Sequence, residues 1–131
     1  MKRKRHPEDN LENMVSEYLQ SRYPQVIFRF DSSAGAKKTM FQAQRFKKLH
    51  GKRTRGHPDL FLYEARGGYH GLLIELKVVT PFKKDGTLKK SEHLEIQAAR
   101  HEELRERGYK VEFGVGFDKV KRIIDEYLSN T

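Results

Sequence analysis

The alternation of apolar and polar positions predicts a β-hairpin at the centre of the chain. Two apolar runs of strand length, 60–63 and 72–77, lie on either side of the pair Gly67-Gly68. Glycine pairs between such runs are typical of a turn that reverses the chain. The two strands are therefore expected to pair with each other.

The second of these strands carries charge on one face only. Glu75 and Lys77 are two residues apart and share a face, whereas Ile74 and Leu76 point to the other. Folding the hairpin brings Asp59, at the start of the first strand, close to Glu75. Burying two carboxylates in apolar strands is costly unless something binds them. A divalent cation, which takes oxygen ligands, would bind both carboxylates and offset this cost. Taken alone, Asp59 also fits the start of a turn, and Glu75 with Lys77 also fits a solvated stripe on a half-exposed strand.

Helical and extended patterns continue on both sides of the hairpin and predict one mixed β-sheet with helices packed against it. The chain is expected to consist of a basic tail over 1–6 and one α/β domain over 7–131, in the order α-β-β-β-α-β plus a C-terminal helix. The expected elements are a helix from Pro7 that ends at Tyr23-Pro24, a strand over 26–30, a short helix over 39–50 anchored by Met40, Phe46 and Leu49, the hairpin with its second strand extended by Val78 and Val79, a helix from Ser91 to Gly108, a strand over 109–115 and a helix over 117–128.

Composition narrows the range of partners. The chain has 131 residues, enough for one domain, and no cysteine, which rules out disulfides and zinc-thiolate sites. Its 27 basic and 18 acidic side chains give a net charge of +9, which favours nucleic acid over acidic small molecules. No apolar run is long enough to span a membrane and no signal-peptide core follows the basic start, so a soluble, cytoplasmic protein is expected.

The positive charge is concentrated in two segments that we expect to contact nucleic acid. Between Asp31 and Gly56 the chain has basic residues and no further acid, and this segment leads directly to Asp59. A polar excursion over 82–90 carries four more lysines, which fit a flexible loop tip equally well. The candidate contacts are Lys37, Lys38, Arg45, Lys47, Lys48, Lys52, Arg53, Arg55, Lys83, Lys84, Lys89 and Lys90.

Two polar residues lie on helix faces that should be partly buried. Gln97 shares a face with apolar residues of the helix that starts at Ser91, and a buried amide should have a polar partner. Glu12 lies beside the apolar stripe of the first helix, whereas Glu17 lies nearer the solvated side. A surface glutamate is the plain alternative for Glu12. The histidines have no metal-ligand spacing, and His57 and His70 are expected to be ordinary surface residues.

The series Gly56-x-Pro58-Asp59, then Ile74-Glu75-x-Lys77, then Gln97 resembles the PD-(D/E)xK nuclease superfamily, and within it the stand-alone, phage-type members of the VRR-NUC branch. Arg100 stands where many of these proteins have an aromatic residue. The resemblance implies a restriction-endonuclease-like core. It also implies catalytic roles for Asp59, Glu75, Lys77 and Gln97, and a metal held by Asp59, Glu75, the Leu76 backbone carbonyl and Glu12.

The resemblance further implies an endonuclease that uses Mg²⁺ or Mn²⁺ to hydrolyse DNA. Branched, flapped or junction DNA, such as a Holliday junction, is the expected substrate, and a homodimer would serve two strands of a junction. A phage-encoded member would act in a bacterial host cell. Two alternatives stay open: a basic nucleic-acid-binding protein without catalysis, and a subunit active only in a larger assembly. Acids facing a phosphate argue against the first, because a simple binder has no use for them.

Overall fold

A four-stranded mixed sheet forms the centre of the computed structural model, which describes residues 7–31 and 39–130. The expectations for the tail over 1–6 and for Lys37 and Lys38 lie outside the described residues. Along the chain the elements are α1 (Pro7–Arg22), β1 (Phe28–Phe30), α2 (Met40–His50), the 3₁₀ helix η1 (Lys52–Thr54), β2 (Leu60–Leu62), β3 (Leu72–Lys77), α3 (Glu92–Glu106), β4 (Lys110–Val115) and α4 (Gly116–Ser129). The strands are arranged in the order β1-β2-β3-β4, with only β3 and β4 parallel.

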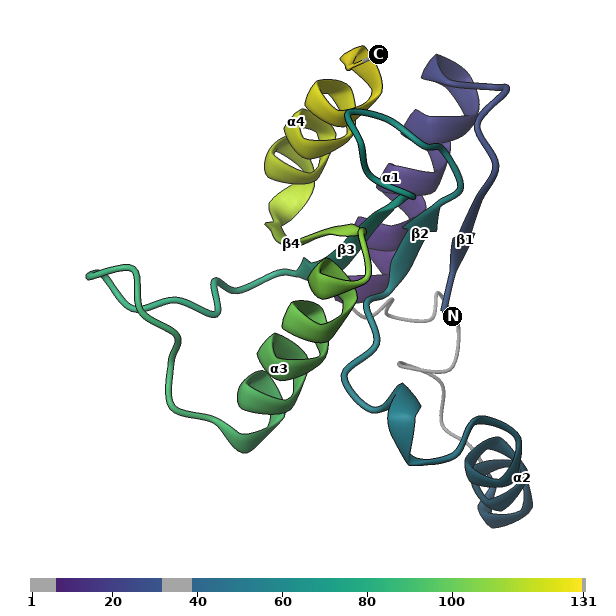
Figure 1. Cartoon of the computed structure of the whole chain (residues 1–131), viewed down its shortest axis with the longest axis vertical. Coiled ribbons are helices and arrows are strands. Elements are labelled where there is room, and N and C mark those ends of the chain that lie inside the picture. Colours follow the sequence, from purple (N-terminus) through teal and green to yellow (C-terminus); the bar gives the residue numbers. More distant parts are fainter. Residues whose placement is uncertain (1–6, 32–38, 131) are drawn as a thin grey trace, which may run out of the picture.

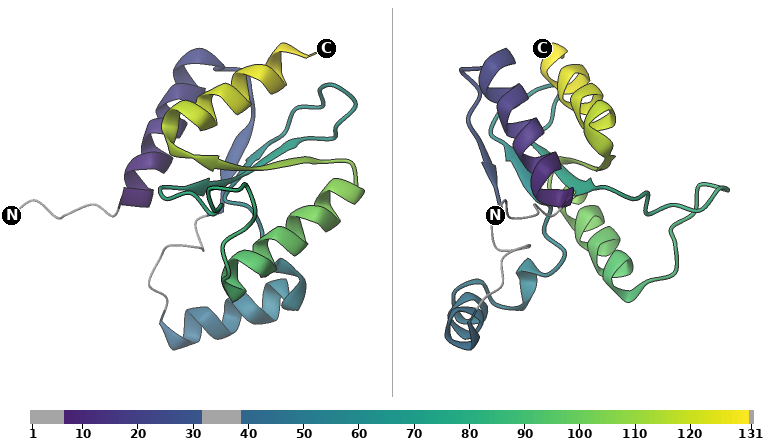
Figure 2. Two further views of the ribbon diagram at one scale, coloured as in Figure 1. Left: turned by 90° about the vertical axis from the view of Figure 1, so that its left-hand side faces the viewer. Right: turned by 180° about the vertical axis from the view of Figure 1, so that it is seen from behind.

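The helices cover the two faces of the sheet unequally. Figure 2 shows α1 and α4 on one face and α3 on the other. The face below α1 and α4 is the main core, because every second residue of the strands points into it. Its members include Leu60, Leu62, Leu72, Ile74 and Leu76 from the strands, and Leu11, Val15, Leu19, Val120, Ile123, Ile124 and Tyr127 from the helices. The predicted mixed sheet and its apolar face are confirmed.

The central hairpin has the predicted pairing. Leu60 lies opposite Ile74, and Leu62 lies opposite Leu72, in an antiparallel ladder.

None of the helices that the structure describes has the length and apolar character needed to cross a membrane.

Two expectations about element boundaries and anchors are wrong. Val78 and Val79 do not extend β3, because its partner β4 ends opposite Lys77 and the chain turns into α4 at Gly116. The predicted helix over 39–50 does form, with Thr39 as its N-terminal cap, but it buries none of its residues. Met40 is 79% exposed and Leu49 is 65% exposed, so these apolar residues are not core anchors. Figure 1 shows α2 standing away from the sheet.

The segment that precedes Asp59 is fixed against α3. Gly56 has a φ of +77°, and a Cβ atom there would lie 2.8 Å from the carbonyl oxygen of Ile96. Arg100 Nε donates a hydrogen bond of 2.9 Å to the carbonyl oxygen of Arg55. Glu103 accepts hydrogen bonds from Arg53 and from Arg100. Arg100 therefore has a clear role here in place of an aromatic ring, and the positive φ of Gly56 bends the chain ahead of Asp59.

This close approach predicts that Gly56→Ala destabilises the protein more than Gly51→Ala. Both glycines have positive φ, but a Cβ at Gly51 would meet nothing within 4 Å. The backbone strain alone should cost about 1–2 kcal/mol in each variant, and the contact with Ile96 should add to it only at Gly56. Urea unfolding of both variants measures the difference. Equal losses of unfolding free energy would contradict the packing of this segment on α3.

Candidate metal and active site

The β2–β3 ladder places two carboxylates side by side. Leu60 pairs with Ile74, so the next position of each strand brings Asp59 opposite Glu75. Asp59 Oδ2 accepts a hydrogen bond of 2.8 Å from the backbone N–H of Leu76. This bond orients the Asp59 carboxylate across the end of β3. The predicted meeting of Asp59 and Glu75 therefore follows directly from strand register.

Burial makes this pair electrostatically costly. Glu75 is 3% exposed. Asp59 is half-buried, and its pKa is raised to about 9, first by burial and then by the hydrogen bond and negative charge of Glu75. The Leu76 N–H and the charge of Lys77 act in the opposite direction without offsetting the rise. In the absence of a cation, the pair therefore retains a proton at neutral pH.

Lys77 completes the predicted group on β3. Its side chain is half-buried, and its charge is close enough to lower the pKa of Asp59. Its Nζ lies 6.0 Å from the centre of the Phe113 ring. The structure thus brings Asp59, Glu75 and Lys77 together as the strand pattern predicts.

Gln97 of α3 is buried, and its backbone lies next to Gly56 in the segment that precedes Asp59. It is 6% exposed, and its Nε2 lies 3.2 Å from Nε2 of His93. The Gln97 Oε1 atom is buried and has no hydrogen-bond partner among the described residues. The expected polar partner therefore exists for one end of the amide. The oxygen end is free to accept a further donor.

His101 belongs to this site and was not identified from the sequence. It is fully buried, and its Nε2 lies 3.8 Å from Oε1 of Glu75. Burial lowers its pKa to about 4, with further contributions from Arg105 and Lys77, so the ring is neutral near pH 7. The available signal was position alone, because His101 follows Gln97 by one helical turn on the inward face of α3.

The donor set suits a hard divalent cation such as Mg²⁺. Asp59 and Glu75 would offer a cation two acidic oxygen ligands in a site that otherwise keeps a proton, and the cation would remove the repulsion between them. The described residues contain no group of three or more His, Cys, Asp or Glu side chains placed to hold a metal. The suitability of the site for a metal therefore rests on Asp59 and Glu75 alone. Two carboxylates are enough for Mg²⁺, because this ion commonly keeps several waters among its ligands.

The first helix has the phase that the sequence predicts. Glu12 is half-buried and Glu17 is exposed on α1. A contribution of Glu12 to the metal shell stays a prediction, as does that of the Leu76 carbonyl.

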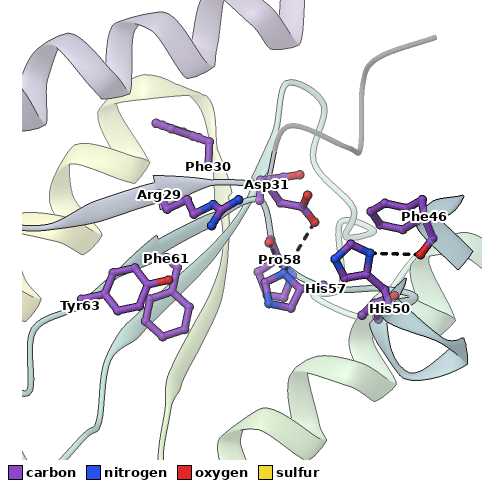
Figure 3. Close-up of a pocket in the computed structure, with 11 residues that line it drawn as sticks. Arg29, Phe30, Asp31, Phe46, His50, His57, Pro58, Phe61 and Tyr63 are labelled. Atoms are coloured by element: carbon purple, nitrogen blue, oxygen red, sulfur yellow. Dashed lines mark hydrogen bonds and ion pairs between the residues drawn. The ribbon is translucent and has the colours of Figure 1, made fainter. Parts of the chain in front are cut away.

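A cleft of about 350 Å³ opens beside Asp59 on the sheet face that carries α3. Figure 3 shows its lining, with Arg29 and Asp31 from the first strand region and Phe61 and Tyr63 from the second. His57 also lines the cleft; its Nδ1 lies 2.7 Å from the carbonyl oxygen of Pro58 and 4.0 Å from Asp31. The cleft offers access from solvent to the Asp59 side of the pair.

The basic candidates divide into different settings. The side chains of Arg45, Lys47 and Lys48 on α2 are exposed, as are Arg55 and the four lysines of the 82–90 excursion. Arg53 is exposed but forms an ion pair with Glu103. The side chain of Lys52 lies outside the described part of the chain. Contact of these residues with nucleic acid stays a prediction.

Comparison with known proteins identifies the fold. No protein-family model and no curated protein matches the chain. A solved structure titled "VRR_NUC domain protein" is 24% identical, with a TM-score of 0.64, and the match covers 98% of this chain and 93% of that one. The chain has the VRR-NUC fold. A second structure, titled "VRR_NUC domain", is 25% identical over 89% of this chain and 97% of that one, with a TM-score of 0.46. The predicted restriction-endonuclease-like α/β architecture, which the VRR-NUC fold represents, is thus confirmed.

The raised pKa of Asp59 predicts how the metal-free protein responds to pH. The folded state keeps a proton on Asp59 up to about pH 9, whereas the unfolded chain loses it near its ordinary value of 3.8. Stability should therefore fall as pH rises through this window. Asp59→Asn keeps the acceptor for Leu76 and removes the titration, so in EDTA at pH 8 its Tm should exceed that of the wild type.

The measurement is thermal unfolding in EDTA between pH 5 and pH 9. Glu126→Gln, which removes an exposed acid of α4, is the matched control and should keep the wild-type slope. If the Tm of Asp59→Asn fell with pH as steeply as that of the wild type, the loss of stability at high pH would not come from ionisation of Asp59.

Proposed function

We propose that the protein is a metal-dependent endonuclease that hydrolyses phosphodiester bonds of DNA. The observation that carries this proposal is the contact of two carboxylates, Asp59 and Glu75, beside the ammonium group of Lys77 at one end of the sheet. The VRR-NUC fold supports it, because this arrangement lies on that fold with an open cleft next to Asp59.

The side chains divide the work of hydrolysis. Asp59 and Glu75, together with the Leu76 carbonyl, would hold Mg²⁺ or Mn²⁺, and Glu12 would act on the same ion or its waters. The bound ion supplies an acidified water and polarises the phosphate. Lys77 orients the attacking water or neutralises the negative charge that develops on the phosphate. Gln97 presents a buried amide oxygen that can accept a hydrogen bond at the site.

Charge supports DNA as the substrate. The net charge of +9 favours a polyanion, and exposed basic side chains occur on α2 and in the 82–90 excursion. Figure 1 shows this excursion extending from the end of β3, the strand that carries Glu75 and Lys77. Preference for branched, junction or flap DNA, and action as a homodimer on two strands, are part of the proposal and rest on the resemblance and on symmetry.

The test is a cleavage assay on a panel of branched, nicked and linear DNAs. We expect no cleavage in EDTA and activity with Mg²⁺ or Mn²⁺. Asp59→Asn and Glu75→Gln should each reduce cleavage by at least about a hundredfold, while DNA binding is equal or tighter because a repelling charge has been removed. Equal cleavage with and without chelator would contradict the metal mechanism. Tight binding without cleavage under any metal condition would favour a non-catalytic binder.

Lys77→Met and Glu12→Gln separate the roles within the site. Loss of Lys77 should abolish turnover even at saturating metal, whereas loss of Glu12 should raise the metal requirement and be partly rescued by high Mn²⁺. Glu17→Gln is the matched control, because Glu17 is exposed on the same helix. Loss of activity in Glu17→Gln but not in Glu12→Gln would show that the acid of α1 is wrongly assigned.

A further inference from the structure

Among the described residues, no helix packs directly on the part of the α3 face of the sheet that β1 and β2 form next to the carboxylate pair. Within this part of the chain, α3 lies against β4, and neither β1 nor β2 has close backbone contacts with a helix. Arg29 pairs with Phe61, and the backbone N–H of Tyr63 bonds to the carbonyl oxygen of Ile27. These four side chains alternate with core residues and therefore share this face of the sheet. Ile27 is 69% exposed and Tyr63 is 51% exposed.

The aromatic part of this face is held in a fixed arrangement. The Phe61 and Tyr63 rings are stacked, with their centres 4.2 Å apart and 25° between their planes. The Tyr109 and Phe61 rings form a T-shaped pair with their centres 5.9 Å apart, and a Cβ at Gly71 would lie 3.2 Å from the Phe61 ring. Phe61 is thus held in place by Tyr109 and by the backbone at Gly71. Tyr63 rests on it and stays half exposed.

Arg29 adds a cation to this aromatic pair. Its side chain is exposed, and within the described residues it makes no hydrogen bond or ion pair. Arg29, Phe61 and Tyr63 all line the cleft that also contains Asp59, as Figure 3 shows for the three side chains. We call these three residues the aromatic ledge. An exposed guanidinium beside a fixed aromatic ring combines the groups that bind a phosphate and a base.

We propose that the aromatic ledge binds an unpaired nucleotide of the substrate next to the phosphate that is cleaved. The base stacks on Tyr63, and Arg29 binds the adjoining phosphate. Bases of an intact duplex are already stacked on each other, so the ledge favours DNA with unpaired bases, as at branches, flaps and single-stranded ends. Stacking on an aromatic ring tolerates every base, which suits a nuclease that selects structure rather than sequence. This inference rests on the proposed function.

The shape of the site favours a nucleotide over a second copy of this chain. The ledge forms one wall of a concave cleft of about 350 Å³, within the usual range of small-ligand sites. A stable interface between two copies would need a broad surface of roughly 800 Å² on each partner. The cleft also continues to Asp59, so an occupant of the ledge adjoins the candidate metal site.

The test measures binding in EDTA, so that it does not depend on cleavage. The probes are a fluorescein-labelled oligothymidylate, an abasic strand of the same length and a blunt duplex. The wild type should bind the thymidylate roughly tenfold more tightly than the abasic strand, and Tyr63→Ala should lose most of this preference. Arg29→Gln should weaken binding to both strands and lower the salt slope by about one. Tyr69→Ala, an exposed tyrosine of the turn before β3, is the matched control and should keep the preference.

An unchanged preference for the thymidylate in Tyr63→Ala would overturn the proposal. The same result together with a change of oligomeric state in Tyr63→Ala, measured by light scattering, would assign the ledge to contact between copies of the chain instead. The proposal would also be overturned if Tyr63→Ala lost affinity equally for the duplex, the thymidylate and the abasic strand. Failure of the proposed nuclease function is a separate result: the wild type would prefer the thymidylate as expected and cleave no DNA with metal.

Discussion

The antiparallel pairing of β2 with β3 is the constraint on which the site depends. Its register brings Asp59 opposite Glu75, and the Leu76 N–H bond to Asp59 fixes the geometry at 2.8 Å. The apolar residues between them fill the core below α1 and α4, so the pairing cannot shift by one residue without turning that core to solvent. Hydrophobic packing therefore stabilises an unfavourable contact between two acids. This is the arrangement expected where binding of a cation is to be favoured.

The two faces of the sheet differ in what packs on them. One face forms the hydrophobic core with α1 and α4, and the other carries α3, the carboxylate pair and the cleft. On the core side, Tyr18 and Tyr23 of the α1 region donate hydrogen bonds to Asp125 of α4 and tie the two helices together. On the other side α3 buries Gln97 and places His101 beside Glu75 of β3, while β1 and β2 stay open to the cleft. Arg100 and Gly56 connect α3 to the segment before Asp59. The same helix thus holds both the buried polar residues and the approach to the carboxylates.

The sequence was sufficient for the parts that depend on local periodicity. Alternation within the hairpin predicted the face of Glu75 and Lys77, and helical phase predicted that Glu12 is half-buried and Glu17 exposed. Features that depend on distant packing were not predictable. His101 is one of several histidines without ligand spacing, and its position beside Glu75 follows only from the packing of α3 on the sheet. The exposure of Met40 and Leu49 follows from the position of α2 away from the sheet. The aromatic ledge is visible only once the reach of α3 is known.

The most direct test of the account is a titration of the metal-free protein with Mn²⁺, followed by the loss of the electron paramagnetic resonance signal of the free ion. We expect the wild type to bind Mn²⁺ through its carboxylate pair. Asp59→Asn and Glu75→Gln should each weaken this binding by at least about tenfold, since each removes an acidic oxygen ligand. Glu126→Gln should bind as the wild type does. Equal Mn²⁺ affinity in the wild type and both site variants would contradict the central claim that these two carboxylates form a metal site.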